Sequence, residues 1–198
     1  MHVEEAYAWL LQGLRRQDVL ASLHQPLTPT QLSERLGFSL DTLTQVLREL
    51  TIYQLVSCLN PASRKSRVYG VTPLGVICRD RLAHELNLSL PPYDAPLAVD
   101  WNLYGWVCFS HRRTVLLTLE VPMQPATIAR TAARQHRPGF GERTELRMSA
   151  NNCRDVIKLF LQKAIVEPVR IRGKAHTHFQ LTAIGQELQR LLRRATSP

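Results

Sequence analysis

Two groups of side chains in this sequence have the chemistry to bind a polyanion. One group places amides, hydroxyls and cations along two predicted helices, and such side chains can hydrogen-bond the edges of nucleic-acid bases. Its members are Thr42, Thr44, Gln45, Arg48, Asn151, Asn152, Arg154 and Lys158. The other group is basic and lies in predicted turns and loops, where cations can reach phosphates. Its members are Arg64, Lys65, Arg67, Arg137, Arg143, Arg147, Arg170, Arg172, Lys174 and His176.

The net charge also favours a polyanionic partner, and it lies in the second half of the chain. The formal net charge is +9 and the pI is about 9.9. Residues 1–100 hold 9 Lys and Arg against 10 Asp and Glu, whereas residues 101–198 hold 16 against 6. A basic surface of this kind is typical of proteins that bind nucleic acid.

We find no residue pattern that predicts catalysis. The sequence shows no phosphate-binding loop, paired-carboxylate site or nucleophile–base constellation. Its four cysteines, Cys58, Cys78, Cys108 and Cys153, form no C-x-x-C pair, which favours buried thiols over a metal or redox site. We therefore expect no enzymatic activity, no catalytic residues, no metal and no cofactor.

An internal repeat relates the two halves of the chain. Residues 7–16 resemble residues 104–113, and residues 26–32 resemble residues 122–128 at an offset of 96. From Ser39 onward the offset is 110, so that the Thr-x-x-Gly at 72–75 recurs at 182–185. The two offsets differ by 14 residues, which predicts an insertion near 134–148 in the second copy.

The prolines between the copies indicate where one domain ends and the next begins. Pro91, Pro92 and Pro96 lack backbone donors and disfavour a helix. We predict a first domain at 1–86, a linker at 87–100 and a second domain at 101–198.

The apolar spacing of the first copy predicts a mainly α fold with small β-hairpin wings, an α+β class. An amphipathic helix over 3–14 continues, or is followed by a second segment, through Leu23. A short helix starts at the Thr28 cap and ends at Gly37, and a third helix starts at Ser39. Strands at 55–59 and 67–71 flank the basic turn, and Thr72 caps a last helix.

The segment TPTQLSERLGFSLDTLTQVLRELTIYQLVSCLNPASRKSRVYGVTPLG, residues 28–75, resembles the winged helix-turn-helix domains of ArsR- and MarR-type regulators. The resemblance rests on the order of elements, the L-s-x-x-L-G-f-S turn and the T-x-x-G after the wing. It implies two tandem winged helix-turn-helix domains. Their third helices would enter the major groove, and their wings would contact phosphates.

We therefore expect a double-stranded DNA-binding protein that regulates transcription. The acidic N-terminus and the lack of an apolar span of membrane length predict a cytoplasmic location and no membrane partner. One alternative is an assembly module of tandem winged helices that binds proteins, with which the near-neutral first half is compatible. Another is an RNA-binding or replication-initiation protein. The apolar face of helix 3–14 offers a surface for a homodimer.

Overall fold

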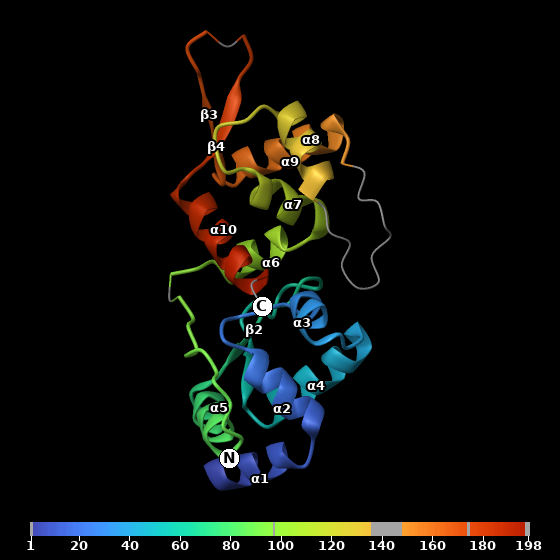
Figure 1. The fold of residues 1–198 in the computed structure, drawn as a ribbon, viewed down its shortest axis with the longest axis vertical. Helices are drawn as coiled ribbons and strands as arrows, with labels where there is room; N and C mark the ends of the chain where they lie inside the picture. Colours follow the sequence, from blue (N-terminus) through green and yellow to red (C-terminus); the bar gives the residue numbers. More distant parts are fainter. Residues whose placement is uncertain (1, 97, 136–147, 174, 197–198) are drawn as a thin grey trace. The chain divides into compact units, whose positions relative to one another are not determined.

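The computed structural model describes residues 2–96, 98–135, 148–173 and 175–196 (Figure 1). Contacts divide the chain into two compact units, Met1–Trp106 and Val107–Ser197. Each unit is mainly helical and contains one two-stranded antiparallel hairpin. The predicted class, mainly α with small β-hairpins, is therefore confirmed. Most of the insertion predicted near 134–148 lies outside the described residues.

Unit 1 packs its helices around a leucine-rich core. Its elements are α1 (Val3–Leu11), α2 (Leu14–Ser22), α3 (Pro29–Leu36), α4 (Leu40–Ile52), β1 (Val56–Cys58), β2 (Tyr69–Val71), α5 (Pro73–Glu85) and α6 (Trp101–Val107), which ends at the unit boundary. The break between α1 and α2 falls at Gln12 and Gly13, so the apolar run at 3–23 forms two helices. Leu10, Leu20, Leu43, Leu47 and Leu82 are fully buried in the core.

Local hydrogen bonds start and stop these helices where the sequence predicts. Thr28 and Gln31 form a capping box at α3, and Gly37 ends that helix with a left-handed φ of 70°. The hydroxyls of Ser39 and Thr72 accept bonds from backbone N–H groups at the starts of α4 and α5.

Unit 2 repeats the order of elements found in unit 1. It contains α7 (Ser110–Thr118), α8 (Pro125–Gln135), α9 (Ala150–Gln162), β3 (Val166–Val169), β4 (His178–Leu181) and α10 (Ala183–Thr196). The β3–β4 hairpin extends away from the helices of this unit (Figure 1). Val115, Ile157, Phe160 and Leu192 are buried in its core.

Equivalent backbone contacts recur in the two units at the offsets seen in the sequence. Leu27 bridges Tyr69 in unit 1, and Met123 bridges Phe179 in unit 2. The Thr72 N–H donates to Leu55 O, and the Thr182 N–H donates to Ile165 O.

The Thr-x-x-Gly motif has a packing explanation in both units. A Cβ at Gly75 would overlap the carbonyl oxygen of Leu55, and a Cβ at Gly185 would overlap that of Ile165. Glycine therefore allows α5 in unit 1 and α10 in unit 2 to lie against the turn that precedes the hairpin.

The turn between β1 and β2 does not project freely, because it packs against α6. Asn60 is buried and accepts a bond from the Val68 N–H at 2.7 Å. A Cβ at Gly105 of α6 would come within 2.5 Å of Ser66 O. In addition, the Gln31 side chain donates to the Tyr104 hydroxyl at 3.0 Å. α6 thus belongs to the packing of unit 1, although the sequence repeat pairs it with α1.

Candidate interaction surfaces

The predicted polar residues of α4 and α9 lie on the solvent side of these helices, and several bond within their own helix. Thr42 is half-buried near the Ser39 cap, and the other members of the group are exposed. Thr44 Oγ1 donates to Leu40 O at 2.7 Å, and Gln45 Nε2 donates to Glu49 at 3.2 Å. Arg154 donates to Asn151 at 2.7 Å, and Lys158 lies 3.5 Å from Asp155. Arg48 and Asn152 are also exposed.

The predicted basic residues of the hairpins are exposed, but the two hairpins present them differently. Arg64, Lys65 and Arg67 surround the turn that packs on α6, and Arg67 Nε donates to Ser63 O at 3.2 Å. Arg170, Arg172 and His176 lie in the extended hairpin of unit 2. Arg137, Arg143, Arg147 and Lys174 lie outside the described residues. Among the described residues, each unit therefore carries its own exposed basic residues on its hairpin.

Exposed apolar side chains lie at the end of α1, the start of α2 and the end of α4 in unit 1, and we call this set the α1–α4 surface. It consists of Leu11, Leu14 and Ile52, with exposed fractions of 44%, 78% and 62%. Trp9 and Tyr53 stack beside it with ring centroids 3.6 Å apart. This stack ties the end of α4 to α1.

A shallow pocket of about 360 Å³ lies on the same surface, between the start of α2 and the outer side of α4. Leu14, Gln45 and Val46 line it. At its border the Arg16 guanidinium bonds Glu49 at 2.9 Å and lies 4.0 Å from the centre of the Trp9 ring. The surface thus combines a protruding leucine with an adjacent hollow.

Residues 91–94 of the chain lie along the outer edge of β2 in unit 1. The Val71 N–H donates to the Tyr93 hydroxyl at 3.0 Å, and the Asp94 N–H donates to His24 O at 2.8 Å. The Arg79 guanidinium donates to Pro91 O at 2.8 Å, and the Arg79 side chain is only 1% exposed. Desolvation by this burial lowers the pKa of Arg79. Residues 91–94, which fall in the predicted linker, are therefore anchored to unit 1.

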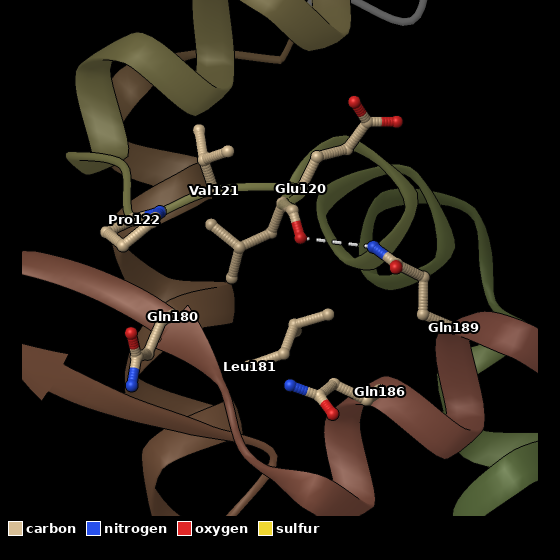
Figure 2. A pocket seen from close by; sticks show the side chains of 8 residues that line it. Glu120, Val121, Pro122, Gln180, Leu181, Gln186 and Gln189 are labelled. Carbon is tan, nitrogen blue, oxygen red and sulfur yellow. Dashed lines mark hydrogen bonds between the residues drawn. The ribbon is translucent and has the colours of Figure 1, made fainter.

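The equivalent position in unit 2 holds an open pocket of about 210 Å³ (Figure 2). Residues 119–122 form one wall, and Gln180, Leu181, Gln186 and Gln189 form the other. Gln189 Nε2 donates to Leu116 O at 2.7 Å and to Leu119 O at 3.1 Å. Figure 2 shows Gln186 and Leu181 directed toward the space that Val121 and Pro122 border.

The sequence predicted the α1–α4 surface only in part, as the apolar face of helix 3–14, and it did not identify the pocket of unit 2. Leu14 and Ile52 are apolar residues at helix ends. The spacing of apolar residues alone places them on the buried face of a helix and does not reveal that they are exposed. One sequence difference pointed to the pocket of unit 2. Gly70 in the first repeat corresponds to the much larger Gln180 in the second, so the two units differ at this strand. We found no group of metal-binding side chains among the residues that the structure describes.

Comparisons with known proteins give one finding. A family model described as the O-methyltransferase dimerisation domain matches residues 14–79, about a third of the chain. The match covers α2, α3, α4, the β1–β2 hairpin and the first half of α5. No curated protein and no solved structure matches the chain.

This match corrects the predicted family and function. The identification as an ArsR- or MarR-like tandem winged helix-turn-helix protein is wrong, as is the predicted role as a DNA-binding regulator of transcription. Double-stranded DNA has no support as a partner. The cause of the error is physical: helix order, caps and a Thr-x-x-Gly contact serve the packing of a core, and a core does not specify what its surface binds. The individual residues predicted to contact DNA stay untested. The DNA-binding function from which they were predicted is no longer supported.

The described part of the chain has no helix with the length and apolar character needed to cross a membrane. The match to a dimerisation domain supports the predicted homodimer. The proposal of a protein-assembly module therefore agrees better with the findings than the DNA-binding prediction does.

Proposed function

We propose that unit 1 is a homodimerisation module that holds two copies of this chain together. The observation that carries the proposal is the match of residues 14–79 to the O-methyltransferase dimerisation domain. The proposal concerns assembly. That the chain has no enzymatic activity stays a prediction.

The α1–α4 surface is our proposed site of contact. A two-fold dimer uses the same patch on both copies, so its interface must be self-complementary. This surface meets that requirement, because Leu14 protrudes beside a pocket of about 360 Å³ that Leu14 itself borders. In the proposed dimer, Leu14 of each copy fills the pocket of the other.

The charges around the pocket suit an interface with an apolar centre and a polar rim. The Arg16–Glu49 pair lies at the border of the pocket, and its two side chains are 23% and 30% exposed. Burying a largely exposed leucine contributes about 1.5–2 kcal/mol to the free energy of association. Because the dimer has two-fold symmetry, each residue contributes twice. Leu11 at the end of α1 and Ile52 at the end of α4 are further exposed apolar residues that such an interface could cover.

Sedimentation velocity of Leu14→Asp tests the proposal. We expect the unmodified chain to sediment as a dimer at micromolar concentration and Leu14→Asp to sediment as a monomer. A buried, unpaired carboxylate in each half of the interface should weaken association by at least about a hundredfold.

Ile184→Asp is the matched control. Ile184 is an aliphatic residue of α10 in unit 2, and it is 48% exposed. This variant should remain a dimer. A monomeric unmodified chain would reject the proposed function, and dissociation by Ile184→Asp but not by Leu14→Asp would move the interface to unit 2.

A further inference from the structure

The proposed contact surface of unit 1 has a counterpart in unit 2, because the helices that form its pocket are repeated. The helices α2 and α7 both have nine residues, and they correspond at an offset of 96. The buried pair Val19–Leu20 of α2 thereby corresponds to the buried pair Val115–Leu116 of α7. The helices α4 and α9 both have 13 residues and correspond at an offset of 110. The side chains at the pocket can therefore be compared position by position.

The protruding leucine of unit 1 has no equivalent in unit 2. Leu14 is the first residue of α2 and is 78% exposed, whereas the first residue of α7 is Ser110. A serine side chain is too short to fill a pocket on another copy, and it has little apolar area to bury. Unit 2 therefore lacks the side chain that makes the proposed contact.

The hollow beside that leucine is also altered in unit 2. Gly13 lines the pocket of unit 1 and corresponds to Phe109, which is 49% exposed. A Cβ at Gly13 would come within 3.0 Å of the Arg16 side chain, so Arg16 lies against a residue that has no side chain. In unit 2 the corresponding arginine, Arg112, lies over the Phe109 ring, 5.4 Å from its centre. Unit 2 thus has an aromatic ring at a border where unit 1 has only backbone.

The polar residues of the pocket differ as well. Glu49, which forms the ion pair at its border, corresponds to Leu159. Gln45 corresponds to Asp155, whose side chain is 71% exposed and lies 3.5 Å from Lys158. A contact like that of unit 1 would bury the Asp155 carboxylate on both copies, and burial of a charge in an apolar contact is costly. The outer side of α9 is therefore unfavourable for such a contact.

We propose that these four differences restrict homodimerisation to unit 1. The inference rests on the proposed function, and it adds which residues determine that one repeat pairs and the other does not. They are Gly13, Leu14, Gln45 and Glu49 in unit 1 and Phe109, Ser110, Asp155 and Leu159 in unit 2. A chain with the same self-pairing surface on both units could bind two other copies at once, and further copies would follow. With one such surface, the assembly closes at two chains.

Gly13→Phe tests the contribution of the hollow. Gly13 precedes α2 with a φ of −144°, which other residues also adopt, so the substitution should leave the fold intact. The added ring competes with Leu14 of the other copy for the pocket. We expect the dimer Kd, measured by sedimentation equilibrium, to rise at least about thirtyfold. Thr177→Phe adds a ring at an exposed position beside β4, and this matched control should keep the Kd of the unmodified chain.

The reverse exchange tests whether the four positions are sufficient. In the Leu14→Asp chain, unit 2 receives Phe109→Gly, Ser110→Leu, Asp155→Gln and Leu159→Glu. We expect this grafted chain to form dimers at about 10 µM, where Leu14→Asp alone is a monomer, and circular dichroism checks its fold.

A Gly13→Phe dimer as tight as that of the unmodified chain would overturn the inference. So would a folded grafted chain that stays monomeric, and if the grafted chain does not fold, Gly13→Phe decides alone. A monomeric unmodified chain would instead reject the proposed function, which separates the two tests.

Discussion

Among the described glycines of unit 1, Gly75 has the closest packing contact. Its α-carbon lies so close to the Leu55 carbonyl that no side chain fits between them. Gly75→Ala should therefore destabilise the protein by about 3 kcal/mol, since the contacting atom belongs to the backbone and cannot rotate away. Urea denaturation followed by circular dichroism measures this change.

Gly37→Ala is the control for that substitution. Gly37 has a φ of 70° and open space around its missing Cβ, so alanine there costs about 1 kcal/mol of backbone strain alone. Equal losses in the two variants would show that Gly75 is required for conformation and not for close packing.

Arg79 should hold residues 91–94 in place without contributing much to global stability. Arg79→Met keeps most of the side-chain volume. It removes the cost of burying a cation and also removes the bond to Pro91 O, and these two effects oppose each other. We expect the free energy of unfolding to change by less than about 1 kcal/mol. The Asp94 amide, which bonds His24 O, should nevertheless exchange its hydrogen at least about tenfold faster.

Asp80→Asn serves as the comparison for Arg79→Met. Asp80 lies 3.8 Å from the Arg79 guanidinium but makes no part of the bond to Pro91. In Asp80→Asn, the backbone amide of Asp94 should exchange its hydrogen at the same rate as in the unmodified chain. Equal acceleration in both variants would contradict the anchoring role of Arg79.

At the level of residues, the sequence predicts what depends on near neighbours. Thr28, Ser39 and Thr72 cap their helices as expected, because the groups they bond lie three residues away along the chain. The contact of Arg79 with Pro91 spans 12 residues and depends on how a proline-rich segment folds back. No local pattern predicts it, so residues 91–94 read as a simple linker.

At the level of elements, a cluster of polar contacts clamps α1 to α5. The Tyr7 hydroxyl donates to Glu85 at 2.8 Å, and Arg81 bonds Glu4 at 2.8 Å and Glu85 at 2.9 Å. Hydrogen bonds from Arg81 and then from Tyr7 lower the pKa of Glu85. The clamp therefore contributes fully when Glu85 is ionised and Tyr7 is protonated.

Tyr7 should make this clamp sensitive to alkali. Burial, and then the hydrogen bond to Glu85, raise the pKa of Tyr7 to about 12, whereas an unfolded tyrosine titrates near pH 10. The folded state thus favours the protonated hydroxyl. Its contribution is complete below about pH 10 and is lost as the pH rises from there through about 12.

Tyr7→Phe provides the measurement of that effect. The urea midpoint of the unmodified chain should fall more steeply between about pH 9.5 and pH 11.5 than that of Tyr7→Phe. Parallel curves for the two proteins would show that the Tyr7–Glu85 bond does not couple to folding.

Helices and strands were predicted well, and their roles were predicted poorly. The spacing of apolar residues defines α2 to α5 because each must bury one face. The β1–β2 turn was expected to project as a wing, but it packs against α6. A helix from the next repeat gives no local signal of where it packs. Basic residues on a turn indicate solvent exposure and do not identify what the turn contacts.

At the level of the whole molecule, a dimer should link stability to protein concentration. If unfolding separates two chains, a tenfold rise in concentration should raise the Tm by about 2 °C. Differential scanning calorimetry across a hundredfold range of concentration measures this dependence. The Tm of Leu14→Asp should be independent of concentration, and a similar slope in that variant would place the association elsewhere.

The family could not be predicted from the order of elements, since that order follows from the core. Burial of Leu43, Leu47 and Leu50 requires an amphipathic α4 whatever its outer face binds. The excess of basic residues lies in the second half, whereas the family match lies in the first. Charge therefore indicated a function for a region that the matched family does not include.

The placement of α6 has a practical consequence for dissecting this protein. A cut at residue 100, where the repeated sequence begins again, would separate Tyr104 from Gln31 and uncover the backbone that Gly105 approaches. The resulting N-terminal fragment would contain one complete copy of the sequence repeat. It would nevertheless lack α6, the helix against which its β1–β2 turn packs. Fragments meant to behave as native halves should instead be divided after Trp106.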